Sequence, residues 1–298
     1  MNETRVAMSS PSAAQSDSRV VLDVQGYIYF ERHTKKTNID VLKRIRFFGK
    51  PRDGHRHLDI GCGPGTFTKD YLVPLSSPCK MLLAIENSPS MIDFAKENSA
   101  HDNILYRVFD FGGSDATELL NAYGHFDRIY SFLCFHYVKD ELKAYRDIAK
   151  LLTPQCGECL VTSAIACEPV DAWLHMHLME RWRDVVPDPR PVYSNQFRFD
   201  LDKNLADAES EIRSVVSEAG LTCNECYLFE TEWLFPDVNS CVDAFFGVSE
   251  LFKSVPPTKI DDVKKEWARI LSQRSKQTAG EFAMRTTWYC VHAQSATI

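Results

Sequence analysis

The sequence lacks three features that would mark other classes of protein. It contains no apolar run long enough to span a bilayer, and its first residues have no hydrophobic core of the kind found in secretion signals. Basic residues are not in excess, since 34 Lys and Arg against 41 Asp and Glu give a net charge of −7, whereas nucleic-acid-binding domains carry a basic surface. We therefore expect a cytoplasmic globular protein with no membrane span and no nucleic-acid partner.

Motifs of several enzyme classes are missing as well. No Gly-x-Ser-x-Gly nucleophile elbow is present. Two Cys-x-x-Cys pairs occur, Cys156/Cys159 and Cys223/Cys226, but they are far apart, and the second lies within a predicted strand, where positions i and i+3 point to opposite faces. The ten cysteines are spread through the chain without a secretion signal, so free thiols are expected. These patterns predict no metal site.

The most informative stretch is a glycine-rich turn between a predicted strand and a predicted helix. Residues 58–60 are typical of a buried strand, and the pattern of a helix begins over 66–72. Between them stand Gly61, Gly63 and Gly65, which allow the backbone to turn sharply and to approach a ligand closely. A strand, a glycine turn and a helix N-terminus form the cofactor end of a doubly wound α/β domain. The spacing differs from the Gly-x-Gly-x-x-Gly of dinucleotide-binding proteins, which disfavours a nicotinamide-dependent dehydrogenase.

Hydrophobic periodicity assigns the rest of the chain to alternating strands and helices. Residues 1–19 are polar and aperiodic and are expected to form a disordered tail, and 20–298 are expected to form a single α/β domain. Two segments, about 167–197 and 236–277, are predicted to be helical insertions. Strands are predicted over 58–60, 80–85, 104–109, 126–132, 159–164, 221–230 and 286–292, and helices over 20–48, 66–72, 89–98, 117–123, 141–152 and 206–219.

An acidic residue, Glu86, ends the second predicted strand. At this position in a doubly wound sheet a carboxylate can accept hydrogen bonds from both ribose hydroxyls of a nucleoside cofactor. The alternative is a solvated carboxylate in front of a helix that Asn87 or Ser88 caps. The distance of Glu86 from the glycine turn in the sequence favours the ribose contact.

The pattern Asp59-x-Gly61-x-Gly63-x-Gly65 resembles motif I of the class I S-adenosylmethionine-dependent methyltransferases. This resemblance implies a Rossmann-like, seven-stranded sheet and S-adenosylmethionine as the cofactor. It also implies that Asp110, after the third strand, contacts the adenine, with a turn aspartate as the alternative. The residues assigned to the cofactor are Asp59, Gly61, Cys62, Gly63, Gly65, Glu86, Asn87, Asp110, Phe111, Ser131 and Phe132.

From Tyr29 to the C-terminus the chain resembles a narrower group, the arthropod juvenile hormone acid O-methyltransferases. The resemblance implies that a methyl group is transferred to the carboxylate of a small lipophilic acid of the farnesoic or juvenile hormone acid type. The glutamine and tryptophan that position this carboxylate in the family are replaced here by Thr37 and Tyr137. The stretches that carry the resemblance are 58–65, Phe126-Asp127, Ser131-Phe132, 134–138 and Val192-Tyr193-Ser194, together with the placement of the two insertions.

The acceptor site implied by this resemblance is apolar with a few neutral donors. A carboxylate acceptor needs no general base because it is already ionised, so the protein has only to orient it and exclude water. We assign Tyr137, His136 and Thr37 to the catalytic position, and the acceptor pocket to Trp173, Met176 and Tyr193.

The segment after the fourth predicted strand discriminates between classes of acceptor. It has neither the Asn/Asp-Pro-Pro-Tyr motif of enzymes that methylate DNA amines nor the glutamate pair of those that methylate protein arginine. The replacements at Thr37 and Tyr137 leave open a cofactor-binding protein that has a different acceptor or has lost turnover. We expect a monomer or a homodimer.

Overall fold

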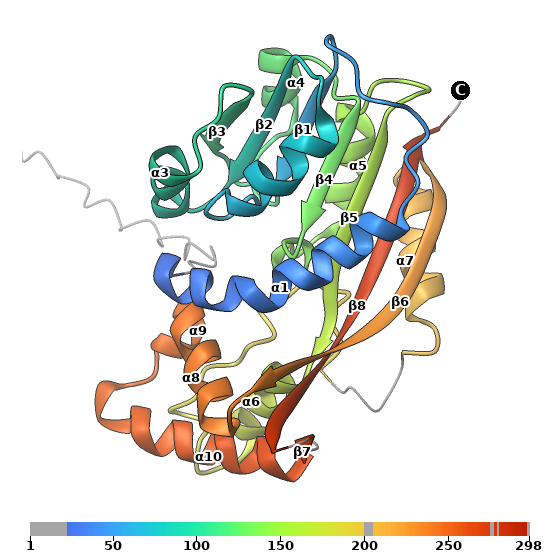
Figure 1. Ribbon diagram of the computed structural model, residues 1–298. Coiled ribbons are helices and arrows are strands. Elements are labelled where there is room, and N and C mark those ends of the chain that lie inside the picture. Colours follow the sequence, from blue (N-terminus) through green and yellow to red (C-terminus); the bar gives the residue numbers. More distant parts are fainter. Residues whose placement is uncertain (1–22, 200–204, 275–276, 279, 297–298) are drawn as a thin grey trace, which may run out of the picture.

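The computed structural model describes residues 23–199, 205–274, 277–278 and 280–296, and it shows one mixed sheet flanked by helices (Figure 1). The strands are β1 (Arg56–Ile60), β2 (Met81–Glu86), β3 (Ile104–Val108), β4 (Arg128–Phe132), β5 (Glu158–Cys167), β6 (Leu221–Phe235), β7 (Gln277–Thr278) and β8 (Glu281–Ser295). Their order is β3-β2-β1-β4-β5-β8-β6, with the short β7 paired to β8. The first five strands pair in parallel, whereas β8 is antiparallel to both neighbours. The predicted Rossmann-like, seven-stranded sheet is confirmed, with β7 as a short addition to it.

The order of the strands reverses direction between β1 and β4. From β1 the chain adds β2 and β3 on one side and then returns to add β4 on the other. In open α/β sheets, ligands bind outside the carboxyl ends of the strands at such a switch point. The segments after β1 and β4 are therefore the places to look for a site.

The helices agree with the sequence prediction where a local signal fixes their ends. The predicted helices over 89–98 and 117–123 are found with those bounds, and the first begins at Pro89 behind Ser88, whose Oγ accepts from the N–H of Met91 at 3.4 Å. The helices are α1 (Val24–Arg44), α2 (Val73–Ser76), α3 (Pro89–Asn98), α4 (Thr117–Tyr123), α5 (Glu141–Leu151), α6 (Glu168–Leu178), α7 (Ala208–Glu218), α8 (Val238–Val248), α9 (Glu250–Lys253) and α10 (Ile260–Arg274). A π-helical turn precedes α2, and 3₁₀ turns occur at Phe135–Tyr137 and Pro257–Lys259.

The largest departure from the prediction lies in β6 and β8. Each strand has 15 residues, whereas strands were predicted only over 221–230 and 286–292. The two strands pair along their whole length, and they extend past the rest of the sheet to the helical insertions (Figure 1). Because the extended parts satisfy each other's backbone hydrogen bonds, they need no further strand, and the local sequence pattern does not reveal this partnership.

A β-bulge in β6 overturns the prediction made for the second Cys-x-x-Cys pair. The register with β8 shifts between Cys223 and Glu225, so Cys223 lies opposite Ala293 and Cys226 opposite Val291. The extra residue therefore places the two cysteines on one face of the sheet, where the thiol of Cys223 donates to the carbonyl of Glu225 and that of Cys226 to the carbonyl of Glu209. No cluster of His, Cys, Asp and Glu within the described residues is arranged to hold a metal ion.

The two insertions correspond to α6 with the loop after it and to α8 through α10. The expected disordered tail, residues 1–19, lies outside the described residues. In the part of the chain that the structure describes, no helix has the length and apolarity needed to cross a membrane.

A buried ionic cluster ties the segment after α1 to the sheet. Glu158 Oε1 accepts from Nε of Arg128 at 2.9 Å, and Oε2 lies 3.0 Å from Nε2 of His292. Oε2 also accepts from the backbone N–H of Phe48 at 3.1 Å. Burial would raise the pKa of Glu158, but the bonds from His292, Phe48 and Arg128 outweigh it, so this pKa lies below its ordinary value.

Replacing Glu158 by glutamine is expected to lower the free energy of unfolding by about 2 kcal/mol at pH 7, because the buried Arg128 loses its charged partner. A carboxyl whose pKa folding lowers stabilises the protein above its unfolded-state pKa and loses that contribution as the pH falls through its folded-state pKa. The wild-type protein should lose this contribution below about pH 4.5, and the E158Q variant has none to lose.

Urea unfolding at pH 7 and at pH 4 measures both effects. The matched control is Glu118→Gln, which breaks an exposed ion pair with Arg107 and should cost less than about 0.5 kcal/mol. The assignment is wrong if E158Q and E118Q unfold alike.

Candidate active site

The glycine turn after β1 is shaped by contacts that a side chain would disturb. Gly61 has a φ of +76°, and a Cβ added there would lie 2.6 Å from Sγ of Cys134. Gly63 also has a positive φ, but its added Cβ would meet only the ring of Tyr27, at 3.4 Å. Substitution at Gly61 therefore displaces the segment after β4, whereas substitution at Gly63 acts mainly on the turn itself.

This turn borders a cavity of about 1,150 Å³, which we call the glycine-loop cavity. It lies at the carboxyl ends of β1, β2 and β4, as the switch point predicts. Six of the residues assigned to the cofactor line it: Gly61, Gly63, Glu86, Asn87, Asp110 and Phe111.

Glu86 is held in this cavity by backbone N–H groups. Its Oε1 accepts from the N–H of Asn87 at 2.9 Å and of Ser88 at 3.1 Å, and its Oε2 accepts from the N–H of Gly63 at 3.3 Å. Burial raises the pKa of Glu86, and the three N–H groups offset part of that rise. A carboxylate has about four lone-pair sites, so Glu86 anchors the turn and still offers acceptor capacity to a ligand hydroxyl.

Asp110 was predicted from the sequence either to contact the adenine or to stabilise a turn, and its position is compatible with both roles. Its Oδ1 accepts from the backbone N–H of Gly113 at 3.2 Å, as a turn aspartate would. The residue also lines the glycine-loop cavity beside Phe111. Its turn therefore presents the carboxylate to the cavity, where an exocyclic amine is a suitable donor.

The other five residues assigned to the cofactor lie behind the cavity and do not line it. Asp59 is buried and accepts from Oγ1 of Thr68 at 2.6 Å, and burial raises its pKa to about 7. Ser131 donates to the carbonyl of Ile60 at 3.0 Å. The contacts of Asp59 and Ser131 brace the glycine turn from within the protein. The five residues that do not line the cavity are Asp59, Cys62, Gly65, Ser131 and Phe132.

Helix α1 covers the glycine turn and continues over a second cavity. Tyr27 lies against Gly63, and Oγ1 of Thr66 donates to the carboxylate of Glu31. Phe30 and Thr34, on the same helix, line the second cavity. Figure 1 shows α1 between the α/β part of the molecule and the helical insertions, so this helix forms a wall shared by both cavities.

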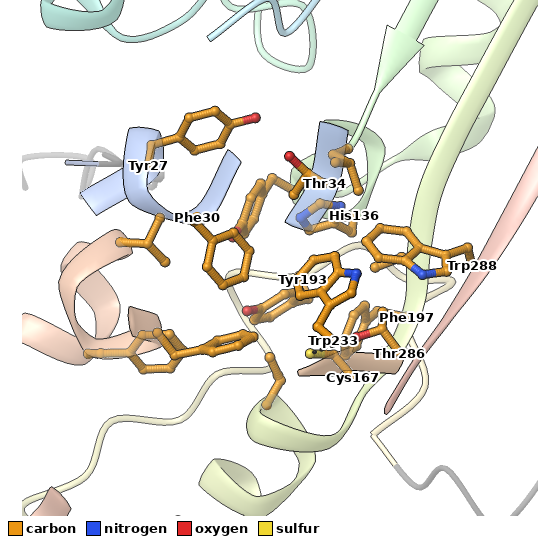
Figure 2. Close-up of a pocket in the computed structure, with 17 residues that line it drawn as sticks. Tyr27, Phe30, Thr34, His136, Cys167, Tyr193, Phe197, Trp233, Thr286 and Trp288 are labelled. Carbon is orange, nitrogen blue, oxygen red and sulfur yellow. Dashed lines mark hydrogen bonds between the residues drawn. The ribbon is translucent and has the colours of Figure 1, made fainter. Parts of the chain in front are cut away.

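The second cavity, which we call the aromatic cavity, has a volume of about 650 Å³ and lies between α1, the segment after β4, and the extended parts of β6 and β8 (Figure 2). None of its 17 lining residues carries a carboxylate, an ammonium or a guanidinium group. The lining consists of Tyr27, Phe30, Thr34, Leu133, His136, Tyr137, Ala164, Cys167, Val170, Tyr193, Phe197, Trp233, Phe245, Val248, Phe252, Thr286 and Trp288. Such a lining favours an apolar ligand oriented by a few neutral polar groups.

Three residues border both cavities: Tyr27, Leu133 and Tyr137. Leu133 has a φ of +60°, a conformation that L-residues with a branched side chain rarely adopt and that strains the backbone. Its N–H donates to the carbonyl of Thr162 at 2.9 Å, which holds it in place. Strained residues cluster at functional sites, and here the strain falls where a ligand in one cavity would meet a ligand in the other.

The polar groups of the aromatic cavity are neutral. Tyr137 and Tyr193 have ring centroids 5.5 Å apart, and burial raises the pKa of both. Burial also lowers the pKa of His136 to about 3, so its imidazole is uncharged at neutral pH. Both tyrosine hydroxyls are therefore protonated at neutral pH and can donate to a ligand.

Thr37, which the sequence analysis assigned to the catalytic position, does not line the aromatic cavity. Thr37 lies beside a separate groove formed with Tyr227 and Glu230 of β6, where it is buried. The aromatic cavity instead receives Thr34, three residues earlier. On a helix this difference is about 4.5 Å along the axis, enough to carry Thr37 past the edge of the cavity.

Trp173 and Met176, which were assigned to the acceptor pocket, do not line the aromatic cavity either. Both side chains are fully buried in the core of the insertions and are absent from the cavity lining. Trp173 packs against Phe252, which does line the cavity, with ring centroids 4.8 Å apart. Of the three residues assigned to the acceptor, only Tyr193 reaches the cavity.

Most residues of the aromatic cavity's wall were not predicted from the sequence. Tyr27, Phe30 and Thr34 follow helical spacing, so the pattern that predicted the helix also contained this face. Trp233 lies in the part of β6 beyond the predicted strand, and its indole N–H has no acceptor among the described residues. Thr286 and Trp288 stand two positions apart on β8 and therefore share a face.

Comparison with known proteins finds a family match for the segments that line most of the glycine-loop cavity. Residues 58–160, from β1 into β5, match a family described as a methyltransferase domain. Two curated relatives are juvenile hormone acid O-methyltransferases. The one from Bombyx mori is 20% identical over 224 residues, which are 74% of this chain and 75% of that protein. The one from Drosophila melanogaster is 24% identical over 201 residues, 67% of this chain and 65% of that protein.

Solved structures show the same fold. YcgJ of Bacillus subtilis superimposes with a TM-score of 0.51 at 17% identity, covering 84% of this chain and 95% of that one. A methyltransferase candidate from Bacillus halodurans C-125 superimposes with a TM-score of 0.50 at 16% identity, covering 83% and 95%. The chain thus resembles class I S-adenosylmethionine-dependent methyltransferases, and the domain match confirms S-adenosylmethionine as the expected cofactor.

Proposed function

We propose that this protein is an S-adenosylmethionine-dependent O-methyltransferase that methylates the carboxylate of a small lipophilic acid, of the farnesoic or juvenile hormone acid type. The observation that carries the proposal is the aromatic cavity, which has no charged lining residue and meets the glycine-loop cavity at Tyr27, Leu133 and Tyr137. The two juvenile hormone acid O-methyltransferases among the relatives support the same class of acceptor.

The residues of the glycine-loop cavity fit S-adenosylmethionine. Glu86 offers a carboxylate acceptor to the ribose hydroxyls, and Asp110 offers one to the adenine amine. A Cβ at Gly61 would collide with Cys134, which is consistent with a turn that needs bare backbone close to the ligand.

The chemistry asks the protein mainly to orient and to exclude water. When bound, S-adenosylmethionine supplies an electrophilic methyl group on a sulfonium sulfur. Transfer of that methyl group to a carboxylate oxygen would need no general base, because a carboxylate acceptor is already ionised and has no proton to lose. Tyr137 borders the junction of the two cavities and His136 lines the aromatic cavity, both as neutral donors, and α1 contributes Tyr27 to the same junction.

The neutral lining favours a carboxylate over an amine. An ammonium acceptor would need a base to remove its proton, and no carboxylate lines the aromatic cavity. His136 is a poor base because burial lowers its pKa to about 3. A carboxylate is already ionised and can be oriented by the N–H and O–H groups that this cavity provides.

A methyl-transfer screen with radiolabelled S-adenosylmethionine over lipophilic acids, phenols and amines tests the proposal. The expected product is a methyl ester that releases labelled methanol on alkaline hydrolysis, with acyclic apolar acids as the best acceptors. Label on nitrogen, or on a phenol and never on a carboxylate, would refute the proposal. Cofactor binding without transfer to any acid would show instead a binding protein that has lost turnover.

Replacing Tyr137 by alanine is expected to raise KM for the acid about tenfold and to leave cofactor affinity within about twofold, because Tyr137 acts on the acceptor in the ternary complex. Calorimetry with S-adenosylhomocysteine and steady-state kinetics separate the two. Tyr29→Ala, on the exposed face of α1, is the control and should change neither value.

Replacing Tyr137 by tryptophan restores the residue of the resembled family and should raise turnover of farnesoic-type acids. Loss of cofactor affinity in Y137A would contradict the assignment.

The cytoplasmic location and the choice between monomer and homodimer stay predictions from the sequence.

A further inference from the structure

The hydrogen-bond partners of Ser163 determine where His136 carries its proton. Ser163 lies in β5 with no exposed surface. Its Oγ is 2.7 Å from the backbone nitrogen of His136 and 3.1 Å from Nδ1 of the same residue. Within the described part of the chain these are its two side-chain hydrogen bonds.

The two bonds can be satisfied together in one way. The backbone N–H of His136 is always a donor, so Oγ of Ser163 accepts from it. The hydroxyl proton then needs an acceptor, and Nδ1 of His136 is the one within reach. If Nδ1 carried the ring proton, the buried hydroxyl would be left with two donors facing it and no acceptor, which is costly. The ring proton is therefore on Nε2.

Nε2 of His136 faces the aromatic cavity. It has no hydrogen-bonding partner among the described residues, and it is not one of the fully enclosed polar atoms without a partner. Figure 2 shows the ring of His136 in the wall of the cavity, and the residue lines it. The backbone is held as well, since the carbonyl of His136 accepts from the N–H of Ser194 at 2.7 Å.

We propose that Ser163 is a positioning residue: its hydroxyl fixes His136 in the tautomer protonated at Nε2 and so aims an N–H donor into the aromatic cavity. Resting on the proposed function, the inference assigns this donor to the acceptor carboxylate. A neutral imidazole N–H orients the carboxylate without neutralising it, whereas the other tautomer would place a lone pair against it and repel it. Ser163 thus selects acidic acceptors without touching them.

The tautomer can be measured without any acceptor. In protein labelled with ¹⁵N at histidine, the His136 signals are assigned by their loss in His136→Gln. The expected wild-type spectrum has a pyridine-like Nδ1 and a pyrrole-like Nε2. Ser163→Ala should give a mixture of tautomers, and Ser163→Thr, which keeps the hydroxyl, should restore the single form. The matched control is Ser76→Ala, a serine equally buried but hydrogen-bonded to Tyr130, which should leave the spectrum unchanged.

Kinetics then test the consequence. S163A is expected to lower kcat/KM for the acid about tenfold with cofactor affinity within twofold, and S163T to recover most of it. H136Q, whose amide nitrogen sits near the place of Nε2, should retain more activity than His136→Asn. A wild-type His136 protonated at Nδ1 would overturn the inference, and so would an S163A variant that keeps both the single tautomer and wild-type kcat/KM. If the spectra are as expected and no acid is methylated, the proposed function fails and the tautomer assignment stands.

Discussion

Replacing Glu86 by alanine is expected to weaken the binding of S-adenosylmethionine about 100-fold. Hydrogen bonds to a charged acceptor contribute roughly 1.5–3 kcal/mol each, and the two ribose hydroxyls would lose theirs together. The variant also removes the acceptor for the N–H groups of Gly63, Asn87 and Ser88. Calorimetry with S-adenosylhomocysteine measures the loss, and circular dichroism shows whether the fold is kept. Asp93→Ala, an exposed acidic residue on α3, is the control and should bind as the wild-type protein does.

The contact with the ribose can be separated from support of the turn by a second ligand. A 2′-deoxy analogue of S-adenosylhomocysteine should bind the wild-type protein more weakly than S-adenosylhomocysteine does. The E86A variant should bind the two compounds with about the same affinity. The coupling between the two changes isolates the pairwise contact. If E86A discriminates between the two ligands as strongly as the wild-type protein, Glu86 acts only through the glycine turn, and the direct contact is refuted.

The cofactor half of the site could be predicted because its signals are local. The spacing of Gly61 and Gly63 reports a turn that needs positive φ at both positions. Ser88 caps α3 through a bond to Met91, three residues away, so the end of β2 and the position of Glu86 follow from adjacent sequence. Each of these features depends on neighbours within a few residues, and the structure places Glu86 where the pattern indicated.

The acceptor half could not be predicted in the same way because it is assembled from distant segments. A tryptophan on an apolar helix face gives the same pattern whether that face meets a cavity or a core. Trp173 proves to face Trp267 and Phe252 in the core, whereas Trp233 reaches the cavity from a strand extension that only its pairing with β8 creates. Likewise, the choice between Thr34 and Thr37 depends on where α1 crosses β6, which no local pattern records.

The charges of the two cavities are distributed unequally, and this has a consequence for binding. Three carboxylates, those of Glu86, Asp110 and Asp140, border the glycine-loop cavity with one cation, Lys139, and this excess of negative charge suits a cationic ligand. The aromatic cavity has no cation among its lining residues, so a carboxylate that enters it loses its hydration without gaining a charged partner from the protein. The counter-charge for the acceptor must then come from the cofactor itself.

A lipophilic acid such as farnesoic acid is therefore expected to bind on the order of 100-fold more tightly when the glycine-loop cavity holds a cation. The attacking oxygen must contact the methyl group and so lies about 5 Å from the sulfur. At that separation, two unit charges attract by about 3 kcal/mol at an effective dielectric constant of 20. Sinefungin, whose amine is protonated at neutral pH, replaces the sulfonium without reacting, and S-adenosylhomocysteine provides the neutral comparison.

Calorimetry measures the affinity of the acid for the sinefungin complex and for the S-adenosylhomocysteine complex. The corresponding methyl ester is the control: because it has no charge, its affinities for the two complexes should agree within about threefold. The pH dependence of the acid's affinity is an independent test. Burial without a counter-charge raises the pKa of the acid, so its affinity for the S-adenosylhomocysteine complex should increase as the pH falls toward 5, because the neutral form binds. In the sinefungin complex the carboxylate is stabilised, and this increase should be absent. Equal affinities in both complexes, with the same pH dependence, would mean that a group of the protein neutralises the acid, and the uncharged aromatic cavity would then not be its binding site.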